Sequence, residues 1–258
     1  MSIWGKTAWW QKETQKRRVE SQRVGAGWRN EITVRTKLRL ACCFSASARA
    51  AEIFGILWLM KTKPLFIVIS APSGCGKSTL IDMILQEYCD IVYSISCTTR
   101  EPRGDEEDGL DYHFKTKERF EELIREGAFI EYAKVHDNYY GTLKAPIEEV
   151  LAEGNSMILD IDVQGAAKVR DYVRALPNTD PLKIGYVDIF VLPPDMEELR
   201  RRLEGRGTDS PEVIEKRLVN AEGEIARAGE YMFKVTNDDL GHAFKRLCDL
   251  IDALSGRM

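Results

Sequence analysis

The sequence predicts an α/β fold in which a parallel core sheet is flanked by helices. Short apolar runs, such as residues 65–70 and 186–192, lack polar alternation, as expected of strands buried on both faces. Helix-like stretches separate these runs, and strands that alternate with helices favour parallel pairing. Apolar residues make up 44% and charged residues 30% of the 258 residues, which is ordinary for a globular protein.

Residues 1–59 differ in composition from the rest of the chain. They carry 11 Lys and Arg against 4 Asp and Glu, and all five tryptophans lie before residue 60, whereas residues 60–258 have a net charge of −11. The apolar run over residues 53–60 is too short to span a bilayer as a helix. We expect an extension that is disordered or that precedes the true start at Met60. A transit peptide, or an arm that binds a membrane surface or nucleic acid, is the alternative.

The first predicted strand, over residues 65–70, leads into a glycine-rich turn and a helix that includes residues 80–85. The turn has the pattern of a nucleotide phosphate-binding loop, although the usual first glycine is replaced by alanine. It consists of Ala71, Pro72, Ser73, Gly74, Cys75, Gly76, Lys77, Ser78 and Thr79. Its backbone N–H groups are predicted to bind phosphate oxygens at the positive end of the helix. Lys77 would reach the terminal phosphates, and the Ser78 hydroxyl would ligate Mg²⁺.

The following segment carries a candidate phosphate site and a candidate base site. In chain order we expect a strand over 91–97, a loop over 98–109, a helix over 116–125, strands near 129–135 and 139–142, and a helix over 145–152. Arg100 and Arg103 lie in the loop, and two guanidinium groups can bind a phosphate dianion in bidentate fashion. Glu131 suits guanine, whose N1–H and N2 amino group offer two donors that adenine lacks. Incidental surface charges are the alternative for the two arginines, and the exposed face of an edge strand is the alternative for Glu131.

The last third of the chain continues the alternation. We expect strands over 156–162, 186–192 and 233–237, helices over 164–176, 195–204, 211–228 and 240–254, and a loop over 178–185. Asp160 and Asp162 end a buried strand, as acids linked to Mg²⁺ do, or else cap the next helix. The arginine-rich stretch around Gly205 and Gly207 suggests a mobile lid over the phosphates, with a solvated helix face as the alternative.

The cysteines exclude one class of site. The six cysteines form no Cys-x-x-Cys pair and no cluster with His at metal-ligand spacing. We therefore expect reduced thiols and a cytoplasmic location. The acidic balance of residues 60–258 argues against nucleic acid as a partner, and we expect no membrane partner.

The ordered motifs resemble those of guanylate kinases, which phosphorylate GMP with ATP and so supply GDP for GTP synthesis. The resemblance covers roughly residues 64–254. The segments that carry it are 70–79, 96–103, 129–133, 138–142, 158–165, 203–208 and 237–240. It implies a phosphate-loop kinase with a core sheet, a GMP-binding subdomain at about 96–150 and a helical lid at about 195–222. ATP and GMP are the implied partners, with Mg²⁺ as cofactor, and the oligomeric state stays open.

The resemblance also implies a role for each matching residue. The implied catalytic residues are Lys77, Arg206 and Arg217. The GMP phosphate is assigned to Arg100, Arg103, Tyr112 and Tyr140, and the guanine edge to Ser96, Glu131, Thr142 and Asp160. Asn237 and Asp238 are expected near the adenine of ATP, and Asp162 is a candidate Mg²⁺ ligand through water.

Two other functions are alternatives to the phosphorylation of GMP. A binding module with the same fold and no catalysis is the first alternative, but such modules tend to lose residues equivalent to Lys77, Ser78, Arg206 and Arg217. A related kinase for another small phosphate, such as a ribose phosphate, is the second. Glu131 and the segment 140–142 favour a guanine base over that substrate.

Overall fold

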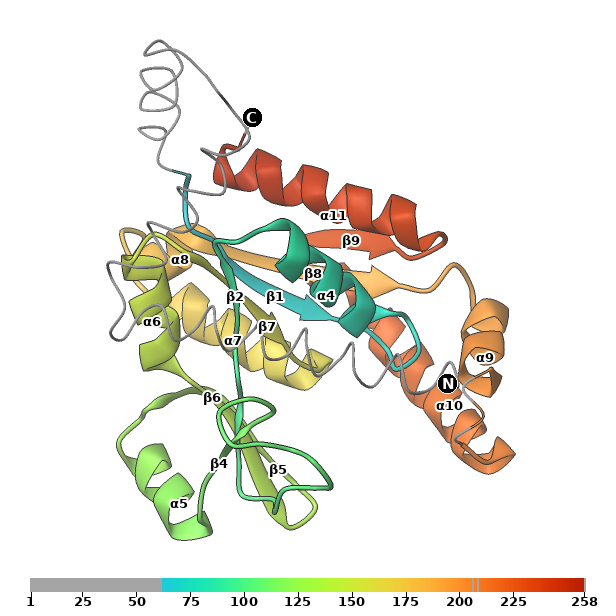
Figure 1. Ribbon diagram of the computed structural model, residues 1–258, viewed down its shortest axis with the longest axis horizontal. Helices are drawn as coiled ribbons and strands as arrows, with labels where there is room; N and C mark the ends of the chain where they lie inside the picture. Colours follow the sequence, from blue (N-terminus) through green and yellow to red (C-terminus); the bar gives the residue numbers. More distant parts are fainter. Residues whose placement is uncertain (1–61, 206, 208, 258) are drawn as a thin grey trace, which may run out of the picture. The chain divides into compact units, whose positions relative to one another are not determined.

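A computed structural model describes residues 62–205, 207 and 209–257 of the chain. Within this part the main sheet has five strands, all parallel, in the order β2-β7-β1-β8-β9 (Figure 1). They are β1 (Phe66–Ser70), β2 (Ile91–Tyr93), β7 (Ser156–Asp160), β8 (Tyr186–Leu192) and β9 (Phe233–Thr236). The predicted α/β fold with a parallel core sheet is confirmed. The predicted extension over residues 1–59 and the candidate lid residue Arg206 lie outside the described residues.

Helices cover both faces of the main sheet, because alternate residues of a strand point to opposite sides. On the central strand β1, Ile67 and Ile69 pack with the helices of one face, and Phe66 and Val68 pack with those of the other. The first face is covered mainly by α4 (Lys77–Glu87) and α11 (Leu240–Ser255), and the second by α6 (Lys144–Ala152) and α7 (Val163–Ala175). All four β1 side chains are fully buried, and burying a side chain of this size contributes about 1.5–3 kcal/mol. The strand that leads into the glycine-rich loop is therefore firmly held.

A second, smaller sheet has four strands in the order β4-β3-β6-β5. The strands are β3 (Cys97–Thr98), β4 (His113–Phe114), β5 (Phe129–Val135) and β6 (Asn138–Leu143), and α5 (Lys117–Arg125) packs on them. The Phe120 ring of α5 stacks on Phe129 and Tyr139 with centroids 4.4 and 5.2 Å apart. Thr116 accepts a hydrogen bond from Arg119 N and so caps α5, as its capping signal predicts. Figure 1 shows this sheet and α5 beside the main sheet, as a separate layer.

The predicted single strand over residues 91–97 is wrong. The segment forms two strands, and β2 belongs to the main sheet while β3 belongs to the small sheet. Ser94 N still donates to Ile158 O of β7 at 2.8 Å, after which the chain leaves the main sheet. Alternation predicts which side chains are buried but not which sheet buries them, so the sequence pattern is continuous across the crossing.

The predicted loop over residues 178–185 contains a short helix, α8 (Pro181–Gly185). Asp180 caps it by accepting from Leu182 N, and Pro181 occupies its first position. Proline there supplies a suitable φ and lacks only an N–H that would have no helical partner. The Asp180–Pro181 pair therefore begins a helix within the expected loop.

Two helices follow β8 at the carboxyl edge of the sheet. They are α9 (Met196–Glu204) and α10 (Pro211–Ala226), and a 3-10 turn, η1 (Ala228–Glu230), follows them. Asp195 and Ser210 cap α9 and α10 through Glu198 N and Val213 N. Buried leucines of both helices join the core cluster of the α4 face, so the pair is packed against the domain (Figure 1). None of the described helices is both long and apolar enough to cross a membrane.

Candidate active site

The glycine-rich loop connects β1 to α4 at the carboxyl edge of the main sheet. Gly74 and Gly76 have φ values of 99° and 81°, which residues with a Cβ rarely adopt. Gly76 is the N-cap of α4 and supplies no side-chain acceptor, so the first N–H groups of α4 are presented to an anion. Among described non-glycine residues only His136 has a positive φ. Ala71 therefore adopts an ordinary conformation, and alanine is tolerated in place of the usual first glycine.

Lys77, the first residue of α4, carries a charge that depends on pH near neutrality. Burial lowers its pKa from 10.5 to about 8, because desolvation disfavours the charged form, and the carboxylates of Asp162 and Glu224 oppose this shift. The ammonium group also forms an ion pair with Asp160, at the end of β7. Asp160 was expected at the guanine edge, and its contact with Lys77 places it at the loop side of the site.

Asp162 and Ser78 are the two candidate metal-ligating residues. Asp162 is the N-cap of α7, and its Oδ1 accepts from Gln164 N at 3.0 Å and Gly165 N at 2.8 Å. The capping role that the sequence left open is therefore present. The Ser78 side chain lies in the first turn of α4 and is exposed. Groups of three or more His, Cys, Asp or Glu that could hold a metal ion do not occur within residues 62–257 as far as these are described.

Arg217 links α10 to the glycine-rich loop. Its Nη1 donates to Ser73 Oγ at 2.9 Å, and its Nη2 donates to Asp209 Oδ1 at 3.2 Å. Three further arginines of the predicted lid, among those that the structure describes, are paired with acids: Arg200 binds Glu215, and Arg201 and Arg202 both bind Glu198. Arg200 and Arg201 thus follow the solvated-face alternative, whereas Arg202 also donates to Asn237 O and Arg217 reaches the loop.

Glu131 and Thr142 face each other across the small sheet. They are register partners on β5 and β6, and Thr142 Oγ1 donates to Glu131 Oε1 at 2.8 Å. Glu131 is only 8% exposed, and burial raises its pKa, while the Thr142 hydrogen bond and the charge of Lys168 oppose that shift. The alternative of an exposed edge-strand carboxylate is therefore wrong. A buried carboxylate has two acceptor oxygens and is suited to accept from paired N–H donors.

Arg100 is held by a carboxylate from its own loop. Its Nη1 and Nη2 donate to the two oxygens of Glu106, both at 2.9 Å, and Glu106 also accepts from Arg103 N at 2.8 Å. This pairing raises the pKa of Arg100 and lowers the pKa of Glu106. The guanidinium group lies 5.4 Å from the Tyr112 ring centroid. No role for Glu106 was predicted from the sequence. Its position three residues after Arg103 is the one sequence feature that could have indicated this pairing.

The tyrosines predicted for the phosphate lie around Arg100. The Tyr112 and Tyr140 rings meet edge to face with centroids 6.2 Å apart, and burial raises the pKa of Tyr112. Arg103 is exposed in the same loop. Ser96 precedes β3 and accepts from His113 N through its carbonyl at 2.9 Å. The structure thus brings Arg100, Tyr112 and Tyr140 together, and Glu131 with Thr142.

Asn237 and Asp238 follow β9 and differ in environment. Asn237 is buried, and its Nδ2 donates to Cys75 O of the glycine-rich loop at 2.8 Å. Asp238 is exposed, pairs with Arg246 of α11 and accepts from Asp239 N. Among the described interactions, Asn237 contacts the glycine-rich loop and Asp238 does not.

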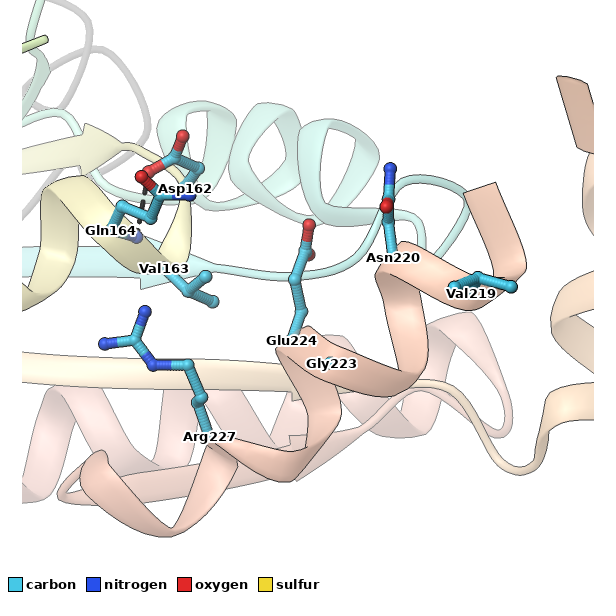
Figure 2. A pocket seen from close by; sticks show the side chains of 8 residues that line it. All are labelled: Asp162, Val163, Gln164, Val219, Asn220, Gly223, Glu224 and Arg227. Atoms are coloured by element: carbon cyan, nitrogen blue, oxygen red, sulfur yellow. Dashed lines mark hydrogen bonds between the residues drawn. The ribbon is translucent and has the colours of Figure 1, made fainter. Parts of the chain in front are cut away.

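A cavity of about 450 Å³ lies between the start of α7 and helix α10. Its lining residues are Asp162, Val163, Gln164, Val219, Asn220, Gly223, Glu224 and Arg227. Figure 2 shows Glu224 and Arg227 projecting from α10 towards the Asp162–Gln164 side. Burial and the charge of Asp162 raise the pKa of Glu224, and Lys77 opposes this shift. No sequence pattern indicates Glu224, because its position in a polar helix resembles that of any exposed acid.

Comparisons with known proteins identify the family of this chain. The family model for guanylate kinase matches residues 62–254. A guanylate kinase of Anaeromyxobacter dehalogenans is 50% identical over 184 residues, covering 71% of this chain and 77% of that protein. One of Rickettsia bellii is 40% identical over 193 residues, covering 75% and 96%. The crystal structure of guanylate kinase from Anaplasma phagocytophilum aligns with a TM-score of 0.56 and 32% identity over 76% of this chain and 88% of that one. The chain belongs to the guanylate kinase family, as its motifs predict.

Proposed function

We propose that the chain transfers the γ-phosphoryl group of ATP to GMP, giving ADP and GDP. The observation that carries this proposal is the buried Glu131–Thr142 pair, which lies in the same domain as a phosphate-binding loop. A loop of this kind supports phosphoryl transfer in general, whereas a buried carboxylate in the small sheet favours guanine among the bases. Family membership supports the same acceptor.

In the proposed reaction an oxygen of the GMP phosphate attacks the γ-phosphorus of ATP. The bond from that phosphorus to the β,γ-bridging oxygen breaks, and ADP leaves with the electron pair. Such a reaction needs positioning and positive charge more than covalent help from the protein. The N–H groups at the start of α4 and the ammonium group of Lys77 are the candidates for the donor phosphates.

The acceptor phosphate is assigned to the cluster around Arg100. A guanidinium group offers parallel N–H donors that match two phosphate oxygens. The phenol groups of Tyr112 and Tyr140 border the same guanidinium group. Arg103 lies in the same loop and is exposed, so its side chain can turn towards an anion.

The residues present fit Mg²⁺, which prefers oxygen ligands. The exposed hydroxyl of Ser78 would hold the ion, and Asp162, whose two capping bonds both go to Oδ1, would contact it through water. Bound Mg²⁺ would neutralise charge on the donor phosphates. We also propose that Arg217 and Arg206 close over the phosphates, and the contact of Arg217 with Ser73 supports this for the first.

An acceptor panel tests the proposal. ADP production from ATP would be measured with GMP, AMP, CMP and UMP, using the full chain and Mg²⁺. We expect turnover with GMP and little with the other three. Equal rates with AMP and GMP would overturn the guanine assignment. Absence of turnover with GMP, together with retained GMP binding, would favour the binding module. The cytoplasmic location stays a prediction that cell fractionation would test. Light scattering would determine the oligomeric state.

A further inference from the structure

Asn237 connects three parts of the donor side of the site. It follows β9 directly and is only 4% exposed. Its backbone N donates to Leu192 O at the end of β8 at 2.8 Å, and its carbonyl accepts from Arg202 Nη2 of α9 at 2.9 Å. Its side-chain Nδ2 donates to Cys75 O at 2.8 Å. The end of the sheet, the first lid helix and the glycine-rich loop therefore meet at one residue.

The side-chain contact lies directly against Gly76 of the loop. A Cβ on Gly76 would lie 2.5 Å from Asn237 Nδ2, so the amide fills the space beside this glycine. The Cys75–Gly76 peptide is planar, and its C=O and N–H point in opposite directions. By holding the Cys75 carbonyl, Asn237 Nδ2 therefore turns the Gly76 N–H to the opposite side of the loop. Loops of this type bind phosphate with such N–H groups.

Packing alone does not explain an amide in this position. Within the described part of the chain, Asn237 Oδ1 is buried without a hydrogen-bond partner. A buried unpaired acceptor is unfavourable, and an apolar side chain of similar shape would avoid that cost. The donor Nδ2 is thus the part of the side chain that a hydrophobic residue could not replace.

We propose that Asn237 is a positioning residue that orients the Cys75–Gly76 peptide for binding the donor phosphates. This role acts through the loop and is distinct from the adenine contact that was expected from the sequence. The inference deepens the proposed function, because it assigns a specific geometric role on the ATP side. Arg202 anchors the same residue from α9, so the loop and the lid helix share this support.

The test compares ATP with tripolyphosphate, which carries the phosphates without the base. Binding of each to the full chain would be measured by calorimetry with Mg²⁺ and without GMP. Asn237→Leu keeps the approximate size, removes the donor and adds no charge. We expect its Kd for both ligands to rise about tenfold, as loss of one structured hydrogen bond beside a phosphate implies. Asn178→Leu, at an exposed loop position, is the matched control and should leave both values unchanged.

The possible outcomes separate the two roles. A loss confined to ATP would show an adenine contact and overturn the proposal, and so would unchanged binding of both ligands. GMP affinity reports whether the fold survives, and Asn237→Ala, with the same readout, replaces Asn237→Leu if the latter fails to fold. These measurements need no turnover. Failure of the wild-type chain to phosphorylate GMP would therefore contradict the proposed function without affecting this binding test.

Discussion

The donor and acceptor sides of the candidate site are built in different ways. The donor side is one continuous loop, held by glycines and by the buried strand β1, with a lysine whose pKa burial lowers to about 8. The acceptor side gathers side chains from separate strands of a small sheet, and its main cation, Arg100, is paired with Glu106. A lysine can lose its charge near neutral pH, whereas an arginine cannot. The two sides should therefore respond differently to substitution and to pH.

Removal of the Lys77 ammonium group should have the largest effect. Lys77→Ala is expected to lower kcat about 1,000-fold, because one donor to developing phosphate charge is lost in a buried site. The KM for GMP should change little, since GMP is assigned to the small sheet. Steady-state assays with each substrate varied would measure both. Lys245→Ala, at an exposed ion pair of α11, is the control. Full activity of Lys77→Ala would contradict the donor role.

On the acceptor side, Arg100→Lys should act through binding. A lysine keeps the charge but not the two parallel donors, so the KM for GMP is expected to rise about 30-fold. The KM for ATP should stay within a factor of about two, as expected for separated sites. Arg119→Lys, on exposed helix α5, is the matched control. Equal increases in both KM values would mean that the two sides are not independent.

Base selection should depend on the charge of Glu131. Glu131→Gln keeps an oxygen that can accept from Thr142 Oγ1. It replaces the other carboxylate oxygen, an acceptor, with an amide group that donates. We expect kcat/KM for GMP to fall about 10- to 100-fold, as when a buried polar group is left unpaired. AMP should be affected less, so the preference for GMP over AMP should narrow. An unchanged preference for GMP over AMP would contradict the assignment of the guanine site to the small sheet.

The pH dependence should distinguish the two cations. The pKa of Lys77 is lowered to about 8, so its charged fraction falls as pH rises through that value. The kcat/KM for ATP, which reports the free enzyme, should be about tenfold lower at pH 9 than on its plateau below pH 7. GMP affinity should not follow this decline, because Arg100 stays charged. Parallel decline of both would indicate a different titrating group.

The same contrast explains what the sequence could predict. The donor loop follows from contiguous residues 71–79, and the strand-loop-helix context confirms its local structure. The pairing of Glu131 with Thr142 depends on β5–β6 register with a bulge between Phe129 and Glu131, which no local pattern encodes. The broken strand at residues 91–97 was missed for the same reason, since alternation does not identify the sheet.

Single side chains were harder to predict than elements. Side-chain chemistry in this site depends on partners that are distant in the sequence. Glu106 binds Arg100, 6 residues away, and Asn237 binds Cys75, 162 residues away. The surroundings of Glu224 likewise come from other elements. A polar loop or a polar helix gives no hint of such partners. Asp162 illustrates the opposite case, because a helix cap is local and was foreseen as one of its two roles.

Glu106→Gln should have the smallest effect and gives the finest comparison. Its pair with Arg100 is partly exposed, with side chains 10% and 24% accessible, so the ion pair itself contributes modestly. Glutamine can still accept from Arg103 N but binds Arg100 without charge. We expect the KM for GMP to rise about threefold with kcat unchanged, because the guanidinium group is less well fixed. Glu107→Gln, the exposed neighbour, is the control. A lower KM would instead mean that Glu106 competes with the GMP phosphate for Arg100, and the acceptor side would then be held closed by its own loop.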